Sequence, residues 1–203
     1  MLNARLKLDA LITYGTQKKA LLFARKCLVL AKRLEASGEI EYFKGQVDLV
    51  QKKFAAAIEH FDAAIRFNPR DGAAYNDRAL CMVELGIIDE ALPYFDKGIE
   101  VEPDYATIYH NKGWLLNNIG KHREAIACFN KALALEPGRA VTYDNLADAL
   151  YNCSDIKGAI QAYETVLTLL PRNACRGIRR EIVKRLKELR TSDEFKNNYL
   201  AQQ

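Results

Sequence analysis

Side chains that can donate and accept hydrogen bonds recur at a fixed spacing along this chain of 203 residues. Asp77, Asn111 and Asn145 lie 34 residues apart. A side-chain amide offers both a donor and an acceptor, so a row of amides can hold an extended peptide backbone without reading its sequence. The plainer alternative is a set of solvated polar residues on a surface that stays wet. The spacing is compatible with both.

Residues that could carry catalysis or hold a metal lack the necessary spacing. The sequence has no nucleophile elbow, no glycine-rich phosphate loop and no metal-ligand motif. Its three histidines, His60, His110 and His122, fall in different columns of the repeat pattern. His110 could lie near Asp144 and orient a ligand, but proton transfer would also need a substrate pocket. We therefore predict a protein that is not an enzyme, with no cofactor and no metal site.

Cysteine usage and hydropathy indicate the compartment. The five cysteines are Cys27, Cys81, Cys128, Cys153 and Cys175. They form no CxxC pair and are odd in number, which favours buried free thiols in a reducing compartment. No stretch approaches the roughly 20 apolar residues of a membrane span, and charges interrupt the first ten positions, which argues against a signal peptide. The sequence predicts a cytoplasmic location.

The elements that carry these residues repeat every 34 positions. Prolines stand at Pro69, Pro103, Pro137 and Pro171; alanines at Ala57, Ala91, Ala125 and Ala159; aromatics at Phe61, Phe95, Phe129 and Tyr163; and small residues at Gly45, Ala79, Gly113 and Ala147. A period of this length with these columns marks a helical solenoid. Solenoids present extended surfaces for binding. We therefore predict an all-α fold and a binding function.

Each repeat has the pattern of two amphipathic helices. In residues 106–139, the first helix buries a stripe at Leu115, Leu116 and Ile119 and ends at Gly120. Glycine or alanine in the small column lets the paired helix approach, and the aromatic of the second helix fills the space beside it. Proline ends each repeat because it cannot continue a helix.

These columns resemble the tetratricopeptide repeat (TPR) family, with four consecutive repeats at 38–71, 72–105, 106–139 and 140–171. The resemblance implies a right-handed α-solenoid, or superhelix, of antiparallel helix pairs, in which the first helix of each pair lines the inner surface. Residues 1–37 fit the frame less well and are predicted to form a degenerate helix pair. Residues 172–203 are predicted to form a basic capping helix and a short terminal helix from about Ser192 to Leu200, because Thr191 and Glu194 make a capping-box signature.

Carried over column by column, the resemblance places a polar set on the inner surface. The predicted peptide-binding groove consists of Asn76, Asp77, His110, Asn111, Trp114, Asn117, Asn118, Asp144, Asn145, Asp148, Tyr151 and Asn152. Trp114 and Tyr151 would be apolar anchors, of the type enriched in binding hot spots. The alternative for Trp114 is a side chain that lies flat and covers the core.

One class of partner is disfavoured. Tetratricopeptide co-chaperones that grip the carboxyl terminus of heat-shock proteins use lysines and arginines in the inner columns. Here those columns contain no lysine or arginine between Glu39 and Asn152. Carboxylates would repel an acidic tail, so we expect a neutral to basic ligand.

Charge is distributed unevenly along the chain. Residues 1–37 carry +6, residues 38–171 carry −7 and residues 172–203 carry +5. The basic ends are either well-solvated caps or surfaces for an acidic partner, a membrane or nucleic acid. The C-terminal basic face lacks interleaved aromatics, and its apolar side caps the last repeat, so neither nucleic acid nor a membrane is the favoured partner.

The sequence thus predicts a cytoplasmic scaffold or adaptor that holds a peptide or helix of another protein in its concave groove. Two alternatives stay open. The chain could self-assemble into homo-oligomers through its groove or ends, or it could bind an acidic surface through the C-terminal basic helix.

Overall fold

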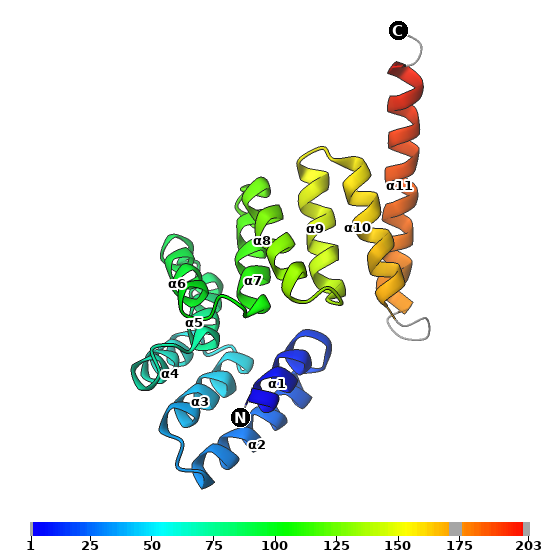
Figure 1. Cartoon of the computed structure of the whole chain (residues 1–203). Helices are drawn as coiled ribbons and strands as arrows, with labels where there is room; N and C mark the ends of the chain where they lie inside the picture. The colour runs from blue at the N-terminus through cyan, green and yellow to red at the C-terminus, as the bar shows by residue number, and fades with distance from the viewer. Residues whose placement is uncertain (1, 171–175, 201–203) are drawn as a thin grey trace. The chain divides into compact units, whose positions relative to one another are not determined.

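The computed structural model describes the backbone of residues 2–170 and 176–200. These residues form eleven α-helices and no strand (Figure 1). The helices are α1 (Leu2–Tyr14), α2 (Gln17–Arg33), α3 (Ser37–Val50), α4 (Phe54–Phe67), α5 (Gly72–Glu84), α6 (Ile88–Val101), α7 (Ala106–Asn118), α8 (His122–Leu135), α9 (Ala140–Asn152), α10 (Ile156–Leu169) and α11 (Arg176–Leu200). The predicted all-α fold is confirmed. Pro171 and Cys175 lie outside the described residues.

The chain divides into two compact units, residues 1–108 and residues 109–203, with the boundary inside α7. In the first unit, each helix from α1 to α6 packs against the next one in sequence. In the second unit, α8, α9, α10 and α11 pack in the same serial way. Packing of each helix on its sequence neighbours is the arrangement of an α-solenoid.

The repeat columns meet inside the helix pairs. The alanines of the 34-residue frame and Phe61, Phe95 and Phe129 are all fully buried. A Cβ atom at Gly113 would lie 2.8 Å from Cε1 of Phe129, and one at Gly45 would lie 2.7 Å from Cε1 of Phe61. These distances are too short for carbon atoms, so the aromatic column requires the small column beside it.

The turn inside each pair also repeats. Lys52, Gly86, Gly120 and Ser154 have φ values of 60°, 79°, 82° and 62°. At each turn the next residue donates its backbone N–H to a carbonyl five residues earlier, as Lys121 does to Leu116 at 2.8 Å. This is the Schellman end of an α-helix, which needs one left-handed residue. Glycine adopts that conformation without strain at two of the four turns.

The C-terminal segment differs from the prediction. The sequence predicts a break near Thr191, yet α11 continues as one helix from Arg176 to Leu200. The Thr191 hydroxyl donates to the carbonyls of Lys187 at 2.6 Å and Glu188 at 3.2 Å. Because this hydroxyl is bonded within its own helix, it does not cap a new one. Ile182, Leu186 and Leu189 of α11 pack on the last helix pair and close the core there.

Candidate functional site

A polar network closes one end of the inner face of the first unit. Arg5 of α1 donates two hydrogen bonds to Glu39, at 3.1 and 3.0 Å, and two to Asp71, at 2.7 and 2.8 Å. Its guanidinium also lies over the Tyr42 ring, 3.7 Å from the centroid. Asp71 in turn caps α5 by accepting from the N–H of Ala74. Two bidentate pairs and a stacked ring fix α1 against the next two helix pairs.

Asn76 and Asp77 lie beneath this network and not in an open groove. Their exposed fractions are 1% and 8%. Asp77 accepts hydrogen bonds from the Tyr42 hydroxyl at 2.9 Å, from Asn76 Nδ2 at 2.8 Å and from Gln46 Nε2. Burial raises the pKa of Asp77 to about 7, against the opposing effect of the Tyr42 and Asn76 hydrogen bonds. The prediction that these two residues face a ligand is wrong, because α3 covers them.

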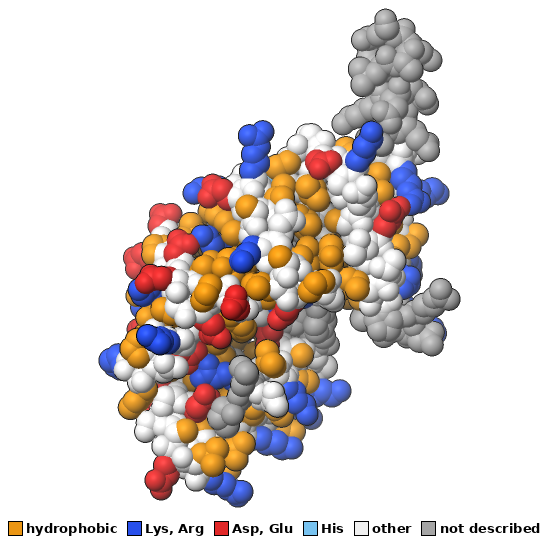
Figure 2. Space-filling model, viewed as in Figure 1, with side chains coloured by type: hydrophobic (Ala, Val, Ile, Leu, Met, Phe, Trp, Pro, Cys, Tyr) orange, Lys and Arg blue, Asp and Glu red, His pale blue; other side chains and the backbone are white. Residues whose placement is uncertain are grey.

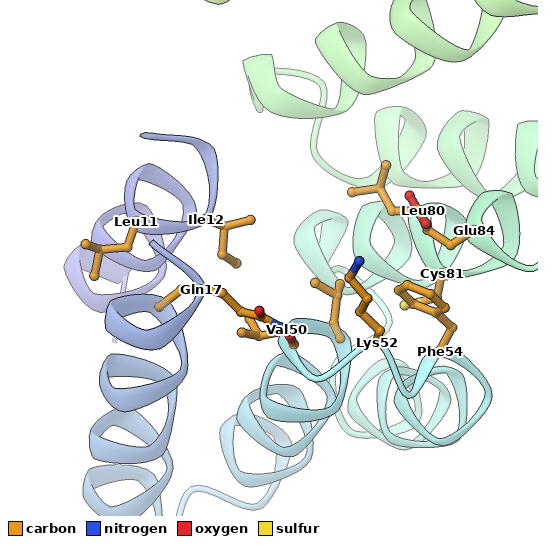
Figure 3. A pocket seen from close by; sticks show the side chains of 11 residues that line it. Leu11, Ile12, Gln17, Val50, Lys52, Phe54, Leu80, Cys81 and Glu84 are labelled. Carbon is orange, nitrogen blue, oxygen red and sulfur yellow. Dashed lines mark hydrogen bonds between the residues drawn. The ribbon is translucent and has the colours of Figure 1, made fainter. Parts of the chain in front are cut away.

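The other end of the same face is a largely apolar hollow of about 430 Å³ (Figure 3). Its lining consists of Leu11, Ile12, Gln17, Ala20, Leu49, Val50, Lys52, Phe54, Leu80, Cys81 and Glu84. Figure 3 shows Ile12 on one side of this space and Leu80 with Glu84 on the other. Lys52 and Glu84 place one positive and one negative charge in the lining. The volume suits a large apolar side chain of a ligand.

Sequence reasoning missed this hollow. Leu49 and Val50 end α3, one repeat before Val83 and Glu84 of α5, so they occupy inner columns. Aliphatic residues in those columns were the available signal. Their proximity to Ile12 depends on how α1 packs, and the degenerate repeat does not encode that packing clearly.

In the second unit, His110 is buried and has an internal partner. Its exposed fraction is 7%, and its Nδ1 lies 2.9 Å from the hydroxyl of Thr142, which is fully buried. Burial, together with the charge of Arg139, lowers the pKa of His110 to about 3. The imidazole is therefore neutral at pH 7. Its predicted place in the groove is wrong, and its partner is Thr142, where the sequence suggested Asp144.

The other nine predicted groove residues keep some exposure. Asn111, Trp114, Asn117, Asp144, Asn145 and Asp148 are half-buried, and Asn118, Tyr151 and Asn152 are exposed. Asn117 Oδ1 lies 2.7 Å from His122 Nδ1 and 3.4 Å from Asn152 Nδ2. The structure thus brings two predicted amides of neighbouring repeats together at one end of α7 and α9.

Asp148 is already paired within the chain. It accepts a hydrogen bond from Arg185 Nη1 of α11 at 2.9 Å and another from the Tyr163 hydroxyl. These residues, with Tyr151, Glu188 and Leu189, line a second hollow of about 300 Å³. Burial raises the pKa of Asp144, and the charge of Asp148 adds to that shift. The acidic character predicted for this face is therefore weaker than its sequence suggests.

Basic residues of α11 hold that helix to its neighbours. Arg179 donates to the carbonyls of Leu167 and Leu170, each at 2.8 Å, and Arg190 donates to Glu164 at 2.6 Å. Arg185 is paired with Asp148. Three cations of the predicted acidic-surface site thus serve to dock the helix.

The described part of the chain offers neither a metal site nor a membrane-spanning helix. No group of three His, Cys, Asp or Glu side chains among residues 2–170 and 176–191 is placed to hold a metal. The described helices include none that is long and apolar enough to cross a bilayer. Among the described cysteines, Cys27, Cys81, Cys128 and Cys153 form no disulfide, and burial raises the pKa of Cys27 and Cys81.

Comparison with known proteins gives a consistent result. Two family models, both described as Tetratricopeptide repeat, match residues 44–106 and 106–139. The Hsp70-Hsp90 organizing protein of Triticum aestivum is 43% identical over 49 residues, which is 24% of this chain and 8% of that protein. The match therefore spans less than a tenth of that relative's length.

Solved structures share the fold. TTC0263, a thermophilic TPR protein in Thermus thermophilus, has a TM-score of 0.70 and 20% identity over 93% of this chain and 97% of its own. The first TPR of Spaghetti (RPAP3), bound to the HSP90 peptide SRMEEVD, has a TM-score of 0.54 and 21% identity over 60% of this chain and 92% of its own. At these identities the likeness concerns the fold alone, and it confirms the predicted α-solenoid.

Proposed function

Because this chain belongs to the tetratricopeptide repeat family and is a protein-interaction module, we propose that the inner face of its first unit binds a segment of a partner protein. The observation that carries the proposal is the hollow of about 430 Å³ at that face. A bulky apolar side chain of the partner would enter it. Full burial of such a side chain contributes about 1.5–3 kcal/mol.

The segment would be neutral to basic. Arg5 lies in an inner column of the first helix pair and forms ion pairs with Glu39 and Asp71, with 15% of its side chain exposed. It leaves no free guanidinium for a carboxylate tail. The HSP90 peptide SRMEEVD of the Spaghetti complex is acidic, so a different ligand chemistry is proposed for this chain.

The second unit, taken by itself, would offer polar contacts to a partner segment. Asn111, Asn117 and Asn145 are half-buried and Asn152 is exposed, and their amides would bond a peptide backbone, with Trp114 and Tyr151 as anchors. Ordering a flexible segment costs free energy, so we expect a dissociation constant of about 1 μM, equivalent to about 8 kcal/mol.

The test is a displayed library of random peptides selected on the wild-type protein, followed by fluorescence anisotropy with the selected peptides. Ile12→Gln changes a hollow residue that is partly exposed and so endangers the fold little. Leu6→Gln is the matched control on the same helix, because Leu6 is exposed but does not line the hollow. We expect about 5- to 30-fold weaker binding for Ile12→Gln, the equivalent of about 1–2 kcal/mol of lost burial. Equal affinities for both variants would refute the assignment.

A second pair of changes tests the other unit. Trp114→Ala combined with Asn111→Ala should abolish recovery of a bound partner while leaving the helical circular dichroism intact. Unchanged recovery would remove the second unit from the proposal and leave the hollow as the binding site.

A further inference from the structure

The exposed side chains of α2 include six cations and the three aliphatic residues Leu22, Val29 and Leu30. The buried face of this helix consists of small side chains, Ala20, Ala24, Cys27 and Ala31. Opposite them, Leu22 and Val29 are 57% and 51% exposed. At about 100° per residue these two side chains fall on one line along the middle of the outer face.

Two rows of cations flank that line. Lys18, Arg25 and Lys32 form one row, and Lys19, Lys26 and Arg33 form the other. All six are exposed, and none forms an ion pair with an acidic side chain that the structure describes. The helix itself contains no acidic residue, and the first one after it is Glu35. In Figure 2, basic and hydrophobic side chains gather together where Figure 1 labels α2.

We propose that α2 lies on an anionic lipid surface, with Leu22 and Val29 entering the interface and the six cations reaching phosphate or carboxylate headgroups. A plane of negative charge contacts both cationic rows at once. Clusters of four to eight Lys or Arg on an amphipathic helix bind anionic lipid, and long basic side chains can extend sideways while apolar neighbours insert.

A protein partner fits this face less well. The helix is about 25 Å long and its face about 10 Å wide, which gives about 250 Å² of contact. A stable protein interface buries about 800 Å² on each partner. A lipid surface of opposite charge can bind this face without a larger contact area.

The basic helix α11 provides the contrast. There Arg179, Arg185 and Arg190 are bound to the chain itself. Cations that dock a helix are not available to a lipid headgroup. The exposed cations Arg180, Lys184 and Lys187 share their helix with the acids Glu181 and Glu188, whereas α2 contains no acid. The two helices therefore permit a charge-matched comparison.

The experiment is co-sedimentation of the full chain with vesicles of phosphatidylcholine alone and with about 30% phosphatidylserine, at about 0.1 and 0.5 M NaCl. One variant carries Arg25→Gln, Lys26→Gln and Lys32→Gln. The control carries Arg180→Gln, Lys184→Gln and Lys187→Gln, which removes the same charge from exposed positions of α11.

We expect the wild-type protein to bind only the anionic vesicles and to be released at high salt. The α2 variant should bind about 100-fold more weakly, because each cation near such a surface contributes about fivefold. The α11 variant should bind like wild type. Equal losses in both variants, or no binding of the wild-type protein at the lower salt concentration, would overturn the proposal.

A fluorescence readout separates insertion from adhesion. Leu22→Trp in a Trp114→Phe background makes position 22 the single tryptophan. Its emission should shift to the blue on anionic vesicles and be quenched by brominated acyl chains. Absence of that shift, or tighter binding to soluble polyglutamate than to the vesicles, would favour an acidic protein partner and reject the lipid surface.

Discussion

Replacing Asp77 with asparagine should remove a pH dependence that burial imposes on the first unit. In the folded protein the pKa of Asp77 rises from 3.8 to about 7, chiefly because the carboxyl group is removed from water. The folded state therefore binds this proton more tightly than the unfolded chain does. Its contribution to stability is complete below pH 3.8 and is lost as the pH rises through about 7.

The magnitude follows from the shift. About three pKa units at about 1.36 kcal/mol each correspond to about 4 kcal/mol when the group is fully ionised. Between about pH 5 and pH 8 the wild-type protein should lose about 2–3 kcal/mol through Asp77. Asp77→Asn should lose none of it, since the amide does not titrate. Its oxygen can still accept from Tyr42, and the Asn76 amide can turn to accept from the new NH₂ group.

The assay is urea unfolding followed by far-UV circular dichroism at about pH 5, 6.5 and 8. The free energy of unfolding of Asp77→Asn relative to wild type should rise by about 2–3 kcal/mol across this range. Asp104→Asn, an exposed position in the same unit, should show no such trend. A flat difference for Asp77→Asn would mean that the carboxylate is solvated, as an open-groove residue would be, and would refute the burial argument.

Three further predictions concern stability. Arg5→Ala leaves the buried carboxylate of Asp71 without its partner and should lower the unfolding free energy by about 3–5 kcal/mol in urea denaturation. Gly113→Ala forces a Cβ atom onto the Phe129 ring and should lower the unfolding free energy by about 1–3 kcal/mol in the same urea denaturation. Gly138→Ala, with nothing within 4 Å of the added atom, should leave it unchanged. For His110 the sign is opposite to that of Asp77, because its pKa is lowered in the folded state. The free energy of unfolding should therefore fall by about 2 kcal/mol as the pH falls from about 6.5 to 5. His110→Gln should abolish this loss in the same urea titration.

The fold could be predicted from the sequence because its determinants are local and repeated. Each small residue meets an aromatic 16 positions later, as Gly113 meets Phe129, and one pair of columns fixes the packing of every helix pair. The turn glycines Gly86 and Gly120 likewise report a left-handed residue directly.

The candidate site could be predicted only in part, because exposure depends on contacts between repeats. Asp77 shares a column with Asn111. Tyr42 and Gln46 cover Asp77, whereas Asn111 is only half-buried. The column alone does not contain that difference. Arg5 belongs to the degenerate repeat, whose irregular spacing hides its pairing with Asp71.

Pairing also hides the true distribution of free charge. Arg185 and Arg179 contribute to a basic stretch in sequence but are used within the second unit. The cations of α2 form a smaller cluster in sequence and remain unpaired with described acids. A net charge counted along the chain cannot separate these cases.

The binding hollow is tested most directly by methyl NMR of the full chain titrated with a selected apolar-anchored peptide. Methyl signals of Leu11, Ile12, Leu49, Val50 and Leu80 should shift together and saturate at one dissociation constant, while those of the exposed Leu85, at the end of α5, stay in place. Saturable binding that leaves the five hollow residues unshifted would contradict the account.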